Sequence, residues 1–112
     1  MSGKTVFVFA SKYLGVGEDE LGEILIKGMF RTLTKVAKKP DILIFLNSGV
    51  ELLIKPDILE NLELILKNGG KILACGTCLE YYNLKDQIES EQISNMHEIL
   101  TAIANGEKVV TF

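Results

Sequence analysis

Short apolar segments alternate along this chain with longer amphipathic ones. The apolar segments at 5–10, 41–46, 71–74 and 108–112 are rich in Val, Ile, Leu and Phe, as strands of a parallel sheet are when helices cover both faces. The amphipathic segments predict helices from 19 to 37 or 38, from 56 to 66 or 67, and from 94 or 95 to 104. Because strands and helices alternate, the pattern predicts an α/β sandwich with a mainly parallel sheet.

The connecting segments carry weaker patterns. We predict a turn at 47–49, a helical turn at 79–84 and a polar loop at 86–94, and Asn68-Gly69-Gly70 ends the second helix. The apolar segment 50–54 fits no single type of element.

Three loops of this arrangement share one edge of the sheet. They are 11–17, 47–49 and 75–78, and each follows the end of a predicted strand. Ligands of open parallel sheets bind beyond the carboxyl ends of the strands, so we expect a functional site at this edge.

The first predicted helix has an unusually wide apolar face. At about 100° per residue its apolar side chains cover an arc of roughly 240°, more than packing on one sheet requires. The residues concerned are Leu21, Ile24, Leu25, Ile26, Met29, Phe30, Leu33, Val36 and Ala37. The excess predicts a second contact, either a second copy of the chain or a covering loop.

Length and charge narrow the classes of protein. The 112 residues fit a single domain, and the net charge of −3 lacks the positive footprint of a nucleic-acid-binding protein. The apolar segment at 5–10 is too short for a signal peptide, and no apolar run approaches the length of a membrane span. We therefore expect a cytoplasmic protein whose partners are neither nucleic acid nor membrane.

Both cysteines lie in the tetrapeptide Cys75-Gly76-Thr77-Cys78, directly after the third strand. In the cytoplasm such a pair is more plausibly reactive than structural. Amide groups at the start of a helix would favour a thiolate near Cys78, Gly76 would leave room for a partner molecule to reach Cys75, and Thr77 would donate a hydrogen bond.

Three alternatives to sulfur chemistry remain for the cysteine pair. In the first alternative, both cysteines serve as small buried apolar residues. Zinc is the second, but a structural site needs four ligands and His97 is the only further one we identify, so we expect no metal. A thioredoxin-like oxidoreductase is the third, although its cysteine motif comes earlier in the domain and faces a proline loop.

Other loops carry weaker signals. The amides of Asn47, Ser48 and Gly49 would bind an anion such as a thiolate or a persulfide, or the three residues would simply form a tight turn. Gly15-Val16-Gly17 resembles part of a dinucleotide fingerprint, but its third glycine is misplaced and acidic residues follow, so we expect no cofactor. Tyr81 and Tyr82 are predicted to pack with their hydroxyls at the surface.

Four motifs in order resemble the DsrE-like domain of YedF-type selenium-metabolism proteins, within the DsrE/DsrF-like superfamily. They are Gly15-Val16-Gly17-Glu18-Asp19-Glu20-Leu21-Gly22, Phe45-Leu46-Asn47-Ser48-Gly49-Val50, Cys75-Gly76-Thr77-Cys78-Leu79-Glu80-Tyr81-Tyr82 and Ile93-Ser94-Asn95-Met96. The resemblance implies a single DsrE-like domain over residues 1–112, built as a three-layer α/β/α sandwich with a mainly parallel sheet of about five strands.

The same resemblance implies a function. Better understood members of the superfamily pass sulfur along as cysteine persulfides and form homo-oligomers, here expected between dimer and hexamer. The persulfide-carrying position matches Cys75, with Cys78 as the resolving thiol. YedF-type proteins usually carry a TusA-like domain ahead of this one, and the resemblance makes a sulfur donor or a TusA-like protein an expected partner.

The sequence thus favours a sulfur or selenium relay protein. Cys75 and Cys78 are its candidate catalytic residues, and Asn47, Ser48, Gly49, Gly76 and Thr77 its candidate substrate-binding residues. A non-catalytic assembly domain with incidental cysteines and a thiol-disulfide oxidoreductase remain as alternatives.

Overall fold

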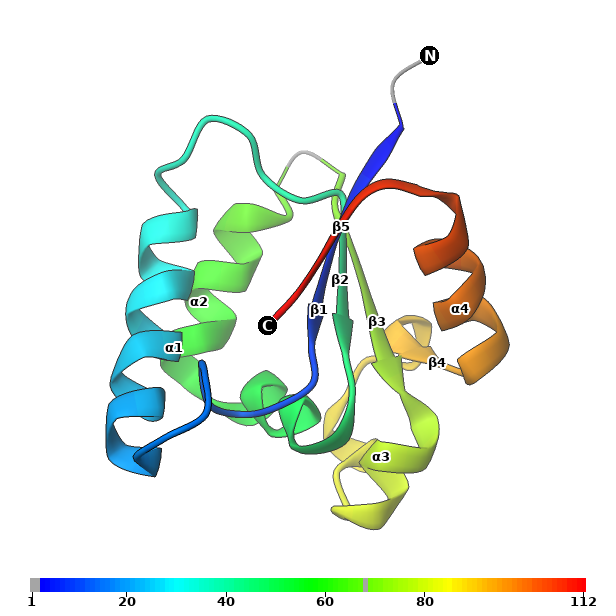
Figure 1. The fold of residues 1–112 in the computed structure, drawn as a ribbon. Helices are drawn as coiled ribbons and strands as arrows, with labels where there is room; N and C mark the ends of the chain where they lie inside the picture. The colour runs from blue at the N-terminus through cyan, green and yellow to red at the C-terminus, as the bar shows by residue number, and fades with distance from the viewer. Residues whose placement is uncertain (1–2, 68) are drawn as a thin grey trace.

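A computed structural model describes residues 3–67 and 69–112 of the chain. Over these residues it contains one five-stranded parallel sheet, with the strands in the order β4-β3-β2-β1-β5 (Figure 1). The strands are β1 (Lys4–Phe9), β2 (Ile42–Phe45), β3 (Lys71–Cys75), β4 (Ile93–Ser94) and β5 (Gly106–Thr111).

Helices cover both faces of the sheet. The α1 helix (Asp19–Leu33) and the α2 helix (Pro56–Ile65) lie on one face, and the α4 helix (Met96–Asn105) lies on the other (Figure 1). The short α3 helix (Gly76–Tyr81) continues directly from the carboxyl end of β3. This arrangement confirms the predicted three-layer α/β/α sandwich with a parallel sheet.

The side chains of β1 contribute to the apolar core on both faces of the sheet, because successive residues of a strand point to opposite faces. Val6 and Val8 lie in the apolar cluster beneath α4, whereas Phe9 belongs to the cluster beneath α1 and α2. The Phe9 ring lies 4.9 Å from that of Phe30 and 5.3 Å from that of Phe45, measured between centroids. This aromatic cluster lies under the loops at the carboxyl edge.

The first helix ends earlier than its apolar pattern predicts. It stops at Leu33 rather than at 37 or 38, and Thr34 is its C-cap. The Thr34 hydroxyl donates to the Arg31 carbonyl oxygen at 2.7 Å, and the Lys35 amide donates to the Thr32 carbonyl oxygen. These local bonds tighten the chain into a turn before Pro40, and such competition is why threonine is a poor residue for a helix interior.

The segment 86–94 was predicted as a polar loop, but it ends in a strand. Ile93 pairs with Ala74 and Ser94 pairs with Cys75, which makes β4 an edge strand beside β3. Two residues are too few for an alternating pattern to be visible in a sequence.

Two other connections differ in detail. The turn at 47–49 and the unassigned segment after it form one 3₁₀ helix, η1 (Asn47–Ile54). The α2 helix ends at Ile65, and Asn68, which we predicted to help end it, lies outside the described residues. The last helix begins as predicted, because the Asn95 side chain accepts a hydrogen bond from the Glu98 amide at 2.8 Å.

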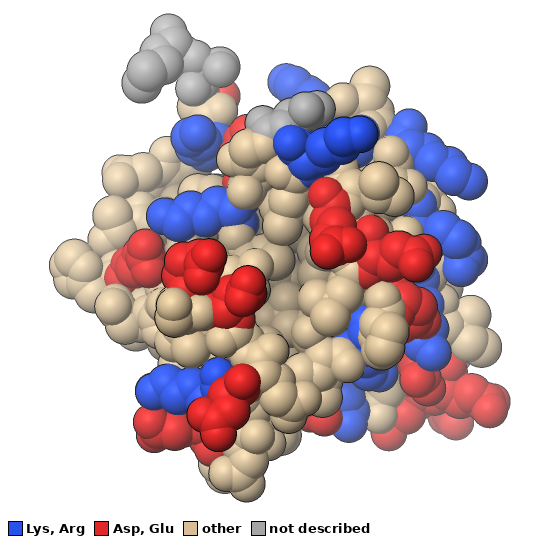
Figure 2. All heavy atoms as spheres, turned by 180° about the vertical axis from the view of Figure 1, so that it is seen from behind, with Lys and Arg blue, Asp and Glu red and all other residues tan. Residues whose placement is uncertain are grey.

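Charges of both signs are intermixed on the face seen in Figure 2, where Lys and Arg side chains lie beside Asp and Glu side chains.

Within residues 3–67 and 69–112, no helix has the length and apolar character needed to cross a bilayer.

Candidate functional site

The three loops predicted to share one edge of the sheet do meet there, because β1, β2 and β3 are neighbours in the sheet. The Lys12 amide donates to the Ser48 hydroxyl oxygen at 3.0 Å, which joins the first loop to the second. The Asn47 amide donates to the Cys78 sulfur at 3.1 Å, which joins the second loop to the third.

Cys75 occupies the last position of β3 and the N-cap of α3. Its side chain is only 4 % exposed and belongs to the apolar cluster beneath α4. The pairing of Cys75 with Ser94 places β4 directly alongside it. The cysteine that the resemblance favours as sulfur carrier is therefore the less accessible of the two.

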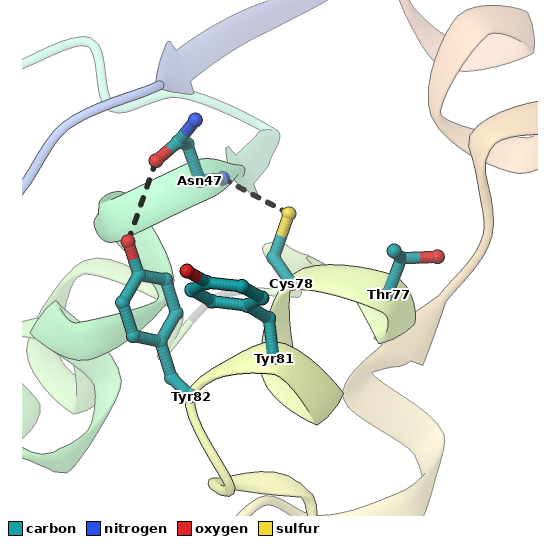
Figure 3. Close-up of a pocket in the computed structure, with 5 residues that line it drawn as sticks. All are labelled: Asn47, Thr77, Cys78, Tyr81 and Tyr82. Carbon is teal, nitrogen blue, oxygen red and sulfur yellow. Dashed lines mark hydrogen bonds between the residues drawn. The ribbon is translucent and has the colours of Figure 1, made fainter.

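Cys78 lies in a pocket of about 370 Å³ at the same edge. The predicted helical turn at 79–84 begins earlier, at Gly76, so Cys78 lies within α3 and one turn beyond Cys75. Figure 3 shows the Cys78 sulfur directed toward η1. The residues lining the pocket are Asn47, Thr77, Cys78, Tyr81 and Tyr82. Both cysteines are free thiols.

Of the three loop amides predicted to bind an anion, only that of Asn47 is directed at sulfur. The Ser48 amide donates to the Asn47 side-chain oxygen at 2.8 Å, and the Gly49 amide donates to the Leu46 carbonyl oxygen at 2.8 Å. Ser48 and Gly49 thus shape the loop, whereas Asn47 contacts the thiol.

Gly76 and Thr77 do not take the positions expected of them. A Cβ atom added at Gly76 would lie 3.1 Å from the Ser94 carbonyl oxygen, so the β4 backbone fills the space that was expected to lead to Cys75. Thr77 lines the pocket, but its hydroxyl points away from the Cys78 sulfur (Figure 3).

Two opposing effects act on the Cys78 thiol. Burial raises its pKa because a thiolate loses solvation there, and this outweighs the Asn47 amide, which lowers the pKa by donating to sulfur. The neighbouring Cys75 thiol raises the pKa of Cys78 further. The sequence predicted that the helix start would favour the thiolate, whereas the balance of these effects disfavours it.

Tyr82 is the member of the site whose contact the sequence analysis missed. Its hydroxyl lies at the surface as predicted, but there it donates to the Asn47 side-chain oxygen at 3.4 Å (Figure 3). Helical spacing was the available signal, because residues four apart lie on the same side of a helix and Tyr82 follows Cys78 by four. Tyr81 is 82 % exposed and forms the rim of the pocket.

His97 lies exposed on α4. Among the residues that the structure describes, no three His, Cys, Asp or Glu side chains gather closely enough to hold a metal ion.

Fold and site together define a parallel α/β domain with an accessible thiol at the carboxyl edge of its sheet. The chain belongs to the DsrE/DsrF-like family, whose model matches residues 27–112. That family is implicated in sulfur relay in general. The family assignment confirms the predicted resemblance, and the YedF-type subgroup stays a prediction.

Structural comparison finds a solved structure with a similar fold. The crystal structure of the YchN protein from E. coli is similar with a TM-score of 0.62 and 14 % sequence identity, covering 97 % of this chain and 99 % of that one. At this identity the likeness shows the fold alone. No curated protein matches the chain.

Proposed function

We propose that this protein is a sulfur relay protein in which Cys78 receives sulfane sulfur from a donor. The observation that carries the proposal is the Cys78 thiol in an open pocket with an amide hydrogen directed at its sulfur at 3.1 Å. An anionic sulfur atom accepts such a bond more strongly than a neutral thiol does. Selenium would follow the same steps as an alternative cargo.

The first step is attack by the Cys78 thiolate on the outer sulfur of a donor persulfide. The donor's sulfur–sulfur bond breaks, the donor leaves as a thiolate that takes up a proton, and a persulfide forms on Cys78. An acceptor thiolate then attacks the outer sulfur, which regenerates the Cys78 thiol without net oxidation. The open pocket supports access for both partner thiols.

Cys75 supports a second way of release. Its thiolate would attack the inner sulfur of the Cys78 persulfide, which forms a Cys75–Cys78 disulfide and expels hydrosulfide. A thiol reductant must then restore the pair. This order reverses the roles assigned from the resemblance, because Cys75 is buried and Cys78 lines the pocket.

The proposal includes a protein partner and a location. A sulfur donor or a TusA-like protein would deliver or collect the sulfur at the open pocket. A cytoplasmic location, where thiols stay reduced, fits both steps.

Intact mass after incubation with a small persulfide donor tests the function. We expect the wild-type protein to gain the mass of one sulfur atom and to lose it again on treatment with a thiol reductant. Alkylation of the cysteines before incubation is the control and should prevent the gain. A wild-type protein that gains no sulfur over a range of pH would contradict the proposal.

The exposed face of α1 supports a homo-oligomer, the partner expected from the sequence. Ile24 is 62 % exposed, and Leu21 and Leu25 also remain exposed beside an apolar groove of about 440 Å³. The groove is lined by Leu14, Leu25, Gly28, Met29, Thr32, Leu33 and Val36. Covering these side chains would remove apolar area from water, which is the main driving force for association.

Charge placed on that face should separate the copies. The double variant Ile24→Lys and Leu25→Lys is expected to be a monomer by light scattering and to stay folded by circular dichroism, because both positions are exposed in the single chain. Leu100→Lys on α4 is the matched control, since Leu100 is also exposed but lies on the opposite layer. A monomeric wild-type protein at working concentration would refute the oligomer.

A further inference from the structure

The backbone conformation of Asn47 directs its amide toward Cys78. Asn47 has a φ of 51°, in the left-handed region that residues other than glycine rarely adopt. Asparagine tolerates this conformation better than most residues because its short polar side chain can bond locally. Here the conformation places the Asn47 amide 3.1 Å from the Cys78 sulfur.

The Asn47 side chain has two hydrogen-bond partners. Its oxygen accepts a hydrogen bond from the Ser48 amide at 2.8 Å and a second one from the Tyr82 hydroxyl at 3.4 Å (Figure 3). Tyr82 follows α3 directly as its C-cap, and Cys78 lies within the same helix. A closed ring of contacts therefore runs from Cys78 through Asn47 and Tyr82 back to α3.

Two further hydrogen bonds hold the loop that contains Asn47. The Lys12 amide donates to the Ser48 hydroxyl oxygen, and the Gly49 amide donates to the Leu46 carbonyl oxygen. With these contacts in place, the Tyr82 hydroxyl is the contact that joins the Asn47 side chain to the helix carrying the thiol.

We propose that Tyr82 is a positioning residue that holds the Asn47 side chain, and through it the Asn47 amide, against the sulfur carried by Cys78. The amide stabilises the Cys78 thiolate, both before it attacks a donor and when it leaves as an acceptor takes the outer sulfur. The importance of this contact for sulfur transfer rests on the proposed function, whereas its effect on the thiol can be measured without any donor.

Removal of the Tyr82 hydroxyl tests the proposal. The rate of Cys78 alkylation by iodoacetamide, followed by peptide mass across a range of pH, should fall about threefold at neutral pH in Tyr82→Phe. At high pH the rate should reach the wild-type plateau, because only the thiolate fraction changes. A purely structural defect would instead alter the plateau or the urea midpoint.

Tyr13→Phe is the control, since Tyr13 is a tyrosine that does not line the Cys78 pocket. We expect its alkylation profile to follow that of the wild type. An unchanged pH profile in Tyr82→Phe, or an equal shift in Tyr13→Phe, would overturn the assignment of Tyr82.

Asn47→Gly tests whether Tyr82 acts through the Asn47 side chain. Glycine keeps the amide and readily adopts a positive φ, but it lacks the oxygen that binds Tyr82. We expect this variant to react slowly like Tyr82→Phe, and the double variant to be no slower than Asn47→Gly alone. Effects that multiply in the double variant would show that Tyr82 acts independently of Asn47 and would overturn the proposal.

These results separate the inference from the proposed function. Sulfur loading of the wild type with an unchanged profile in Tyr82→Phe would reject the positioning of the amide and keep the relay function. If the alkylation profile shifts in Tyr82→Phe but the wild-type protein takes up no sulfur, the positioning role of Tyr82 is kept and the relay function is rejected.

Discussion

Cys78→Ser is expected to abolish sulfur uptake from a persulfide donor, whereas Cys75→Ala should still accept one sulfur atom. The physical reason is access, because Cys78 lines the open pocket and Cys75 is 4 % exposed between β4 and α4. Alanine suits the second variant because Cys75 lies among apolar side chains, where a serine hydroxyl would be buried. Intact mass after a short incubation measures both results.

The two variants also separate loading from release. Cys75→Ala lacks the thiol that would expel hydrosulfide, so it should keep its added sulfur longer than the wild type does in the absence of an acceptor. Urea unfolding is the control, since both variants must be folded for the comparison. Loading of Cys78→Ser together with no loading of Cys75→Ala would reverse the assignment and restore the order first predicted from the resemblance.

Gly49→Ala should strongly destabilise the protein. A Cβ atom at Gly49 would overlap the Phe9 carbonyl oxygen and lie 3.0 Å from the carbonyl carbon, and neither backbone atom can move without disturbing β1. Overpacking of this kind costs about 3 kcal/mol of the free energy of unfolding. With an m value of about 1.5 kcal/mol/M, the urea midpoint should fall by about 2 M.

Gly17→Ala is the control for that measurement. No atom lies within 4 Å of a Cβ added at Gly17, so its urea midpoint should match that of the wild type. A Gly49→Ala protein with an unchanged midpoint would show that β1 and η1 do not approach each other this closely. The variant also bears on function, because Gly49 lies in the loop that presents the Asn47 amide to Cys78.

Local patterns were enough to predict most of the architecture. The apolar segments became the strands β1, β2, β3 and β5, because side chains buried on both faces leave a clear signature within a few residues. The Asn95 cap and the order of strands and helices were equally visible. The same patterns placed the cysteine pair at the carboxyl edge of the sheet, beside the loop that begins at Asn47.

The features that the sequence analysis did not predict depend on specific hydrogen bonds. The apolar pattern continues past Leu33, but α1 ends there because local hydrogen bonds compete with those of the helix. Asn47 has a left-handed backbone conformation, and its side chain accepts a hydrogen bond from Tyr82, 35 positions away in the sequence. The spacing of four residues places Tyr82 on the same side of the chain as Cys78, but it does not report the contact with Asn47.

The sequence by itself determined a parallel α/β sandwich with the thiols of Cys75 and Cys78 at the carboxyl edge of its sheet. Tertiary structure alone decided which thiol is open. Cys75 is buried because a two-residue strand, distant in the sequence, pairs beside it and α4 covers that face. Cys78 stays accessible because α3 directs it into the pocket beside Asn47, and burial of this kind depends on packing between distant segments.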